Sequence, residues 1–159
     1  MKIEHLMSPD VRACKASDSL SAAARIMWSR DCGFVPVVDN PEGKLVGVIT
    51  DRDICIAAAT KHRLADSIPV GEVMSKRTIT CLPTDDVQTA IDRMVQGQVR
   101  RLPIVDKDGR LKGVLSLNDL ALAAEKSDRR AGGGVTYSEV VNAMKAVSAH
   151  RLPGVVTAA

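Results

Sequence analysis

The sequence predicts an α+β fold: two β-α-β-β-α repeats packed in pseudo-twofold symmetry, followed by a C-terminal helix. Three observations support this prediction. Residues of the first half recur in the second half at a nearly constant interval, and each half shows the same order of helix-like and strand-like apolar patterns. A glycine-rich stretch then precedes a final amphipathic segment. We therefore expect repeats at 1–66 and 67–128, with a hinge and an amphipathic helix in 129–159.

The repeat is visible in residue identities. Up to the aspartate that ends VPVVD and LPIVD, matching residues lie 67 positions apart, as do Cys14 and Cys81. Beyond that aspartate they lie 66 positions apart, as do Asp53 and Asp119. The difference falls in a turn, because DNPEGKLVG is one residue longer than DKDGRLKG. A glycine-containing turn between two strands can absorb such a difference.

Each half carries the same elements in the same order. Apolar residues at helical spacing predict helices over 18–30 and 85–96, and a second helix follows in each half over 52–60 and 117–126. Between them, FVPVVD with KLVGVIT and RLPIVD with RLKGVLS predict one hairpin per half. Neither half can cover both faces of so small a sheet, so we expect the pair to fold as one unit with its helices outside. The expected apolar faces of the first helices are Leu20, Ala23, Ala24 and Met27, then Val87, Ala90, Ile91 and Met94.

The C-terminal part is expected to differ from the repeats. RRAGGG at 129–134 predicts a flexible hinge. The segment 137–150 carries Val140, Met144 and Val147 on one helical stripe. This helix either folds back onto the same chain or packs on a second subunit. The final RLPGVVTAA is expected to be frayed.

Composition argues against several classes of function. The net charge of +3 comes from 22 basic and 19 acidic residues that interleave along the chain, and aromatic residues make up only 2%, so nucleic-acid binding is not expected. The N-terminus lacks the apolar core of a secretion signal and no run is long enough for a membrane span. We therefore expect a soluble, cytoplasmic protein without membrane contact. The four cysteines are widely spaced, which favours reduced and mostly buried thiols.

Catalysis is not expected either. None of His5, His62 and His150 stands in a motif with a nucleophile or a second metal ligand. No G-x-S-x-G or phosphate-loop pattern occurs in the sequence. We therefore predict no catalytic residue, no metal site and no cofactor, and the chain is not expected to be an enzyme.

Two short stretches invite a functional interpretation. GVITDRD at 47–53 and GVLSLND at 113–119 each end a predicted strand and begin a predicted helix, with T-x-x-D in one and S-x-x-D in the other. Such a pattern is a capping box, which satisfies exposed N–H groups of the first helical turn. The same groups also suit a nucleotide, because a carboxylate accepts hydrogen bonds from a ribose diol and a helix N-terminus favours phosphate. Both interpretations stay open at this point.

Together with the preceding strands, these stretches resemble a known family. VPVVD…GKLVGVITDRDI and RRLPIVD…GRLKGVLSLNDL look like a tandem pair of CBS (cystathionine beta-synthase) domains, the arrangement called a Bateman module, over about 1–126. The chain is most similar to the small stand-alone bacterial type. The resemblance implies a regulatory, signal-transducing module that binds an adenine nucleotide (AMP, ATP, NAD or similar) in clefts between the repeats and signals to a protein partner. It also implies a homodimer, to which the helix over 137–150 could add a contact.

The resemblance further implies which residues hold the ligand. Each cleft is expected to combine the [ST]-x-x-D of one repeat with the first strand and the h-P-h-h segment of the other. One cleft would use Thr50 and Asp53 for phosphate and ribose, with Ile79, Thr80 and Val99 lining the base. The other would use Ser116 and Asp119, with Arg12, Ala13, Gly33 and Phe34 opposite. Arg100 and Arg101 would reach the phosphates, since a guanidinium can bind two phosphate oxygens at once; otherwise they form a solvated strand edge.

The two halves differ at the position of this arginine pair. The first half has Gly33-Phe34 where the second has Arg100-Arg101, so we predict one competent site and a second that is weaker or empty. Phe34 either stacks on an adenine or plugs its cleft.

The alternative function is a redox-responsive interaction module. Cys14 and Cys81 occupy equivalent first-strand positions, where pseudo-symmetry can bring them near each other. Their other interpretation is that both are small buried hydrophobic residues.

Overall fold

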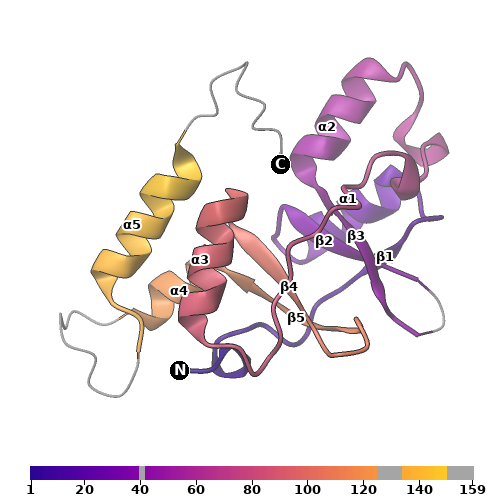
Figure 1. Cartoon of the computed structure of the whole chain (residues 1–159). Coiled ribbons are helices and arrows are strands. Elements are labelled where there is room, and N and C mark those ends of the chain that lie inside the picture. Colours follow the sequence, from indigo (N-terminus) through magenta and orange to yellow (C-terminus); the bar gives the residue numbers. More distant parts are fainter. Residues whose placement is uncertain (40–41, 125–133, 150–159) are drawn as a thin grey trace. The chain divides into compact units, whose positions relative to one another are not determined.

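The computed structural model of the chain describes residues 1–39, 42–124 and 134–149 (Figure 1). It confirms the predicted α+β class. The first half contains η1 (Ile3–His5), β1 (Cys14–Lys15), α1 (Leu20–Ser29), β2 (Phe34–Val38), β3 (Leu45–Thr50) and α2 (Asp51–Thr60), followed by η2 (Ala65–Ser67). The second half contains η3 (Val70–Glu72), α3 (Val87–Gly97), β4 (Arg101–Val105), β5 (Leu111–Ser116) and α4 (Leu117–Ala123), and α5 (Tyr137–Ser148) follows.

Some sequence predictions fall outside the described residues. These are the hinge at 129–134 except for Gly134, the last two positions of the helix predicted over 117–126, and the tail from 150 onward. Within the described part, α4 ends earlier than predicted. Ala124 has an extended backbone with φ −70° and ψ 139°, so the helix stops at Ala123.

The first helix of each repeat buries the face that its apolar spacing predicts. In α3 all four predicted residues are buried. In α1, Leu20, Ala23 and Met27 are buried, whereas Ala24 is only partly so. A large apolar side chain contributes about 1.5–3 kcal/mol when it is fully buried. These faces therefore fix how both helices lie against their strands.

The strands pair as hairpins, as predicted. β2 is antiparallel to β3, and β4 pairs with β5 in a two-stranded sheet. β1 joins the first hairpin in parallel through the pairing of Cys14 with Val37. In the second repeat the corresponding strand is reduced to one isolated parallel bridge between Cys81 and Ile104, so the sequence overpredicted that strand. The pairing of Cys14 with Val37 and the bridge between Cys81 and Ile104 still join positions that are equivalent in the two repeats.

The hairpin turns are closed alike despite their different lengths. The N–H of Asp39 donates to the carbonyl of Lys44 (3.0 Å), and the N–H of Asp106 donates to the carbonyl of Arg110 (2.9 Å). Both bonds join the residues that the repeat makes equivalent. The extra residue of the first turn therefore lies inside the loop, as predicted.

The two turns also bond to each other through equivalent residues. The N–H of Leu45 donates to the carbonyl of Gly109 (3.0 Å), and the N–H of Leu111 donates to the carbonyl of Gly43 (3.1 Å). This reciprocal pair is what the predicted pseudo-twofold symmetry requires. Gly43 and Gly109 have φ angles of 68° and 80°, a conformation that glycine adopts without steric cost.

The chain divides into two compact units that do not follow the repeat boundaries. One unit consists of Met1–Met7, Thr84–Leu102 and the residues from Leu115 onward, and the other of Ser8–Pro83 and Pro103–Val114. Within the first unit, the N–H of Ile3 donates to the carbonyl of Asp85 (3.1 Å). Within the second, the N–H of Val70 donates to the carbonyl of Asp18 (2.8 Å). Thus η1 of the first repeat lies at the start of α3 in the second repeat, and η3 of the second repeat lies at the start of α1 in the first. These exchanged segments explain why the units differ from the repeats.

Helix α5 packs on its own chain, against α3 and α4 of the same unit (Figure 1). Its buried residues are Val140, Ala143 and Val147. The predicted stripe was wrong in one position, because Met144 is 49% exposed. Ala143 fills the inward position instead, and Met144 lies with other exposed apolar residues on the outward side.

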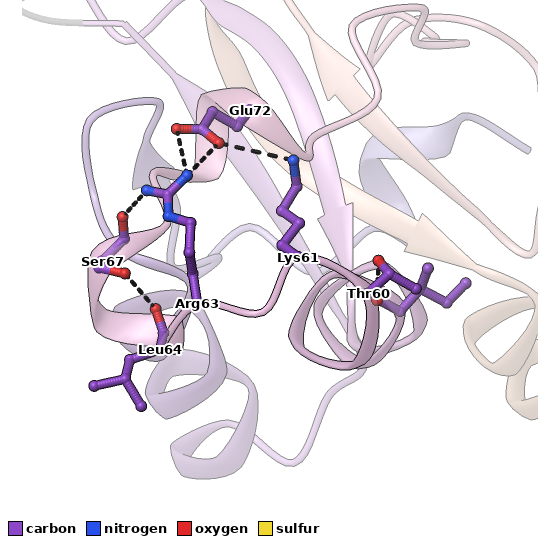
Figure 2. Close-up of polar contacts among 7 residues, drawn as sticks. Thr60, Lys61, Arg63, Leu64, Ser67 and Glu72 are labelled. Carbon is purple, nitrogen blue, oxygen red and sulfur yellow. Dashed lines mark hydrogen bonds and ion pairs between the residues drawn. The ribbon is translucent and has the colours of Figure 1, made fainter.

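Ion pairs hold the connection between the repeats (Figure 2). Arg63 donates through Nη1 to both carboxylate oxygens of Glu72 (3.3 and 3.0 Å) and through Nη2 to the carbonyl of Ser67. The ammonium of Lys61 lies 3.8 Å from the same Glu72 carboxylate. All of these side chains are partly or largely exposed, so each pair adds at most about 1 kcal/mol. Their role is to orient the segment that leads from α2 into η3.

Close backbone approach explains one buried glycine. Val48 and Ser75 exchange both N–H···O bonds (3.0 and 2.9 Å). A Cβ on the neighbouring Gly47 would lie 2.7 Å from the sulfur of Met74 and 2.9 Å from the carbonyl oxygen of Ser75. Only glycine fits there without a shift of its neighbours.

Across the described ranges, no helix has both the length and the apolar character needed to cross a membrane.

Candidate functional site

Thr50 and Asp53 form a complete capping box at the start of α2. The N–H of Asp53 donates to Thr50 Oγ1 (3.2 Å), while Asp53 Oδ2 accepts from the N–H (2.9 Å) and the hydroxyl (2.7 Å) of Thr50. Thr50 is the last residue of β3 and has an extended backbone, as an N-cap residue should. The strand therefore leads directly into the helix, and both side chains are held at that corner.

Ser116 and Asp119 form the same box at the start of α4. Asp119 Oδ2 accepts from the N–H (2.7 Å) and the hydroxyl (2.6 Å) of Ser116, and the N–H of Asp119 donates to Ser116 Oγ (3.2 Å). A third box, made by Thr136 and Glu139, begins α5 with corresponding contacts. The capping interpretation is therefore confirmed for both predicted corners. Because α5 has a box as well, box geometry alone does not indicate a ligand site.

The two aspartate boxes leave one carboxylate oxygen unused. Within the described residues, every hydrogen bond that the Asp53 and Asp119 carboxylates accept goes to Oδ2, and Oδ1 accepts none. Both residues are partly exposed. The cap fixes the orientation of each carboxylate while the second oxygen can still accept a hydrogen bond from outside the protein. Capping and ligand binding are therefore compatible at these corners.

In the second unit, the structure places Gly33 and Phe34 beside the first corner. Phe34 is the first residue of β2 and pairs in register with Thr50. The carbonyl of Gly33 accepts from the N–H of Asp51 (3.3 Å). The predicted residues Gly33, Phe34, Thr50 and Asp53 therefore lie together at one end of this hairpin.

In the first unit, the arginine pair lies beside the other corner. Arg101 begins β4, and the carbonyl of Arg100 accepts from the N–H of Leu117 (3.0 Å). This bond is the equivalent of the one between Gly33 and Asp51. Arg100 is exposed and Arg101 half-buried, so both guanidinium groups are accessible.

The remaining predicted residues flank the first strand positions and β4. Arg12 and Ala13 precede β1, Ile79 and Thr80 precede the Cys81 bridge, and Val99 precedes the arginine pair. All five are at least partly exposed. The predicted combination of residues from opposite repeats in one cleft stays a prediction.

Sequence reasoning missed Asp51. It lies between the two residues of the box, at a position that the pattern T-x-x-D leaves open. A Cβ built on Gly33 would lie 2.5 Å from Asp51 Oδ2, so this carboxylate occupies the space above the glycine. The repeat offers one signal, the exchange of Arg100 and Leu117 for Gly33 and Asp51 at equivalent positions, but only the structure shows that Gly33 and Asp51 lie together.

The cysteines only partly match the expectation of buried thiols. None of the four, all of which lie in the described ranges, forms a disulfide; Cys14 and Cys81 are buried, Cys32 is half-buried and Cys55 is exposed. Burial, with a smaller contribution from the charge of Asp18, raises the pKa of Cys14 to about 11. Only about one molecule in ten thousand would carry the reactive thiolate at pH 7. This disfavours the redox alternative at Cys14.

In the described part of the chain, no group of three or more His, Cys, Asp or Glu side chains could hold a metal ion.

Comparison with known proteins places the repeat in a family. A family model described as the CBS domain matches residues 3–59 and again residues 70–126. The chain belongs to the CBS-domain family. It is 34% identical over 134 residues to the CBS domain-containing protein YhcV of Bacillus subtilis, which covers 84% of this chain and 92% of YhcV. The resemblance inferred from the doubled strand-to-helix motif is thereby confirmed.

Solved structures agree with this membership. The CBS domain pair of protein MJ0100, crystallised with 5′-methylthioadenosine and S-adenosyl-L-methionine, has a TM-score of 0.69 and 25% identity, covering 77% of this chain and 98% of that chain. Hypoxic Response Protein I, crystallised with two coordinated zinc ions, has a TM-score of 0.69 and 26% identity with the same coverage. The chain therefore has the fold of a CBS pair.

Proposed function

We propose that this CBS pair is a non-catalytic regulatory module that binds an adenosine-containing ligand and signals its presence to a protein partner. The observation that carries the proposal is the doubled corner: a strand end, a capped helix and an aspartate with one unused oxygen. The similarity to a CBS pair crystallised with two adenosine derivatives supports the class of ligand.

The chemistry of the corners suits the sugar of such a ligand. A ribose diol offers two O–H donors, and Asp53 and Asp119 each present a carboxylate oxygen that the cap leaves unused. A hydrogen bond to an ionised group contributes about 1.5–3 kcal/mol. Because the cap fixes the carboxylate beforehand, little side-chain entropy is lost on binding. Arg100 and Arg101 would bind a phosphate when the ligand carries one.

Signalling requires that the ligand prefers one arrangement of the protein over another. Only a difference in its affinity for the two arrangements can shift their populations. A coupling of about 1–3 kcal/mol, typical of such systems, changes the affinity for a partner about 5- to 150-fold. The proposed module needs no chemical step for this.

The direct test is a binding survey with the purified chain. Isothermal titration calorimetry with AMP, ATP, NAD, 5′-methylthioadenosine and S-adenosylmethionine should give at least one ligand that binds with defined stoichiometry. Mass spectrometry of the protein under native conditions would identify ligand retained through purification. If none of the five compounds binds and no adenosine compound is retained, the proposed function is wrong.

We further propose that the protein forms a homodimer with a contact through α5. The outward side of this helix carries Tyr137, Val141 and Met144, which are 53%, 48% and 49% exposed and lie at helical spacing. With the buried inner stripe this makes α5 apolar on two sides, which is typical of a helix that is covered on both. Multi-angle light scattering should give the mass of a dimer for the parent and a lower mass for a Tyr137→Ser, Met144→Ser variant. A Leu64→Ser variant, altered at an exposed leucine of the other unit, serves as the control. If the double variant keeps the mass of the parent, the contact through α5 is excluded.

A further inference from the structure

The two repeats present equivalent backbone edges with opposite charge. We define the Gly33 edge as Gly33, Phe34 and Asp51, and the Arg100 edge as Arg100, Arg101 and Leu117. At both edges the same backbone bond joins the residue before the hairpin to the first helical residue, at 3.3 Å in one and 3.0 Å in the other. The backbone therefore acts as an internal control, and the edges differ in their side chains.

At the Gly33 edge a carboxylate takes the place of a side chain. A Cβ on Gly33 would lie 2.5 Å from Asp51 Oδ2 and 3.0 Å from Asp51 Cγ. Gly33 does not have the positive φ that would itself demand glycine. The glycine leaves open the space that Asp51 occupies, and any larger side chain at position 33, such as the arginine of the counterpart, requires the exposed Asp51 side chain to rotate away.

The Asp51 carboxylate is held in place and carries an unbalanced charge. Its Oδ1 accepts from the N–H of Arg52 (2.7 Å), which fixes its orientation. Among the described residues it forms no ion pair within 4.0 Å, not even with the Arg52 guanidinium next to it. Asp51 is exposed, so the charge faces whatever approaches this edge.

At the Arg100 edge the corresponding position is neutral and the charge is positive. Leu117, the counterpart of Asp51, has an uncharged hydrocarbon side chain and is buried at 7% exposure. Arg100 and Arg101 supply two guanidinium groups that are accessible to solvent. This edge attracts a phosphate, whereas the Gly33 edge repels one.

We propose that Asp51 is a specificity-determining residue that excludes phosphate from the Gly33 edge. This edge accepts an adenosine derivative without a phosphate, neutral or positively charged, for which the Phe34 ring offers an apolar contact. The Arg100 edge accepts the phosphorylated nucleotide. The inference rests on the proposed function and refines it: the second site is selective for another ligand rather than merely weak.

The test is a two-ligand titration of the full chain. Calorimetry should show one AMP per parent chain, and the AMP-saturated chain should still bind one 5′-methylthioadenosine. In Asp51→Asn, which keeps the shape of the side chain, AMP should bind a second site with an affinity at least about tenfold higher than in the parent. The affinity for 5′-methylthioadenosine should change less than about threefold, because that ligand carries no charge.

Two further variants make the result decisive. Asp66→Asn removes an exposed carboxylate of the same unit and should behave as the parent. The double variant Gly33→Arg, Asp51→Leu gives the Gly33 edge the residues of the Arg100 edge and should bind two AMP per chain. Two equal AMP sites in the parent, or an unchanged AMP stoichiometry in both Asp51 variants, would overturn the inference and leave the proposed function standing. Failure of both ligands to bind any of the proteins would also overturn the inference, and the proposed function falls with it only if ATP, NAD and S-adenosylmethionine fail to bind as well and no adenosine compound is retained.

Discussion

Replacing Asp53 or Asp119 by alanine separates the role of each carboxylate as a helix cap from its role as a ligand contact. Asp53 Oδ2 accepts hydrogen bonds of 2.9 and 2.7 Å from Thr50, and Asp119 Oδ2 accepts bonds of 2.7 and 2.6 Å from Ser116. Each substitution removes this half of the box only, because the bond from the backbone N–H of residue 53 or 119 to the N-cap hydroxyl remains, so we expect a loss of about 0.5–1.5 kcal/mol of stability. For a chain of this size, each 1 kcal/mol lowers the melting temperature by about 2–4 °C.

The third capping box supplies a matched control. Glu139 Oε2 accepts bonds of 2.9 Å from both the N–H and the hydroxyl of Thr136, so Glu139→Ala removes the same kind of contact from a helix outside the proposed site. All three variants should therefore lose similar stability in urea unfolding. Only Asp53→Ala and Asp119→Ala should lose affinity for an adenosine ligand.

The expected loss of affinity follows from the unused oxygen. A hydrogen bond from a ribose hydroxyl to a carboxylate contributes about 1.5–3 kcal/mol, which corresponds to roughly 10- to 150-fold in the dissociation constant. Calorimetry on the three variants measures this directly. Suppose that Asp53→Ala and Asp119→Ala bind as tightly as Glu139→Ala while all three are equally destabilised. The aspartates would then be caps only, and the reasoning from the unused oxygen would be refuted.

Three other predictions test the packing and the charges. Gly47→Ala should lower the free energy of unfolding in urea by about 1–3 kcal/mol, because the new Cβ overlaps a neighbouring side chain and backbone. Gly134→Ala, which has open space around it, should change that free energy by no more than about 0.5 kcal/mol, and equal effects of the two variants would contradict the contact at Gly47. Iodoacetamide at pH 8 should label the exposed Cys55 well before Cys14, since a pKa of about 11 leaves about one Cys14 thiol in a thousand ionised; equal labelling would be incompatible with the burial of Cys14. The hydrogen bond from the Arg110 N–H lowers the pKa of Asp106 in the folded protein. The charge of Asp106 therefore stabilises the fold above about pH 4, and this contribution is lost as the pH falls through the pKa of the folded state. The stability difference between the parent and Asp106→Asn should shrink from pH 7 to pH 3, and a difference that stays constant would contradict this assignment.

Features that depend on local chemistry could be predicted from the sequence. The stripe of α3 is buried at all four predicted positions, since one helical period decides which side chains point inward. The length difference between the hairpin turns was located correctly, because the aspartate before each turn marks equivalent positions. The capping boxes followed from residue type and spacing alone.

Features that depend on tertiary contacts could not be predicted from the sequence. Met144 and Ala143 are neighbours on the same helix, and which of them faces inward depends on how α5 lies on α3 and α4. The space above Gly33 is filled by a residue 18 positions away in the sequence, so no local pattern reveals it. The crossing of η1 and η3 to the opposite repeats is likewise invisible to periodicity. Each of these was settled by a contact between distant segments.

The duplication makes the differences between the repeats more informative than their shared features. The shared backbone bonds and capping boxes are what both copies need in order to fold, and α5 shows that a box forms where no ligand is expected. The exchange of Arg100 and Leu117 for Gly33 and Asp51 alters no backbone bond at the two edges. A change that leaves the shared backbone intact while reversing the local charge is better explained by what each edge binds than by how the chain folds. If the double exchange at positions 33 and 51 altered stability but not ligand choice, that explanation would give way to a purely structural one.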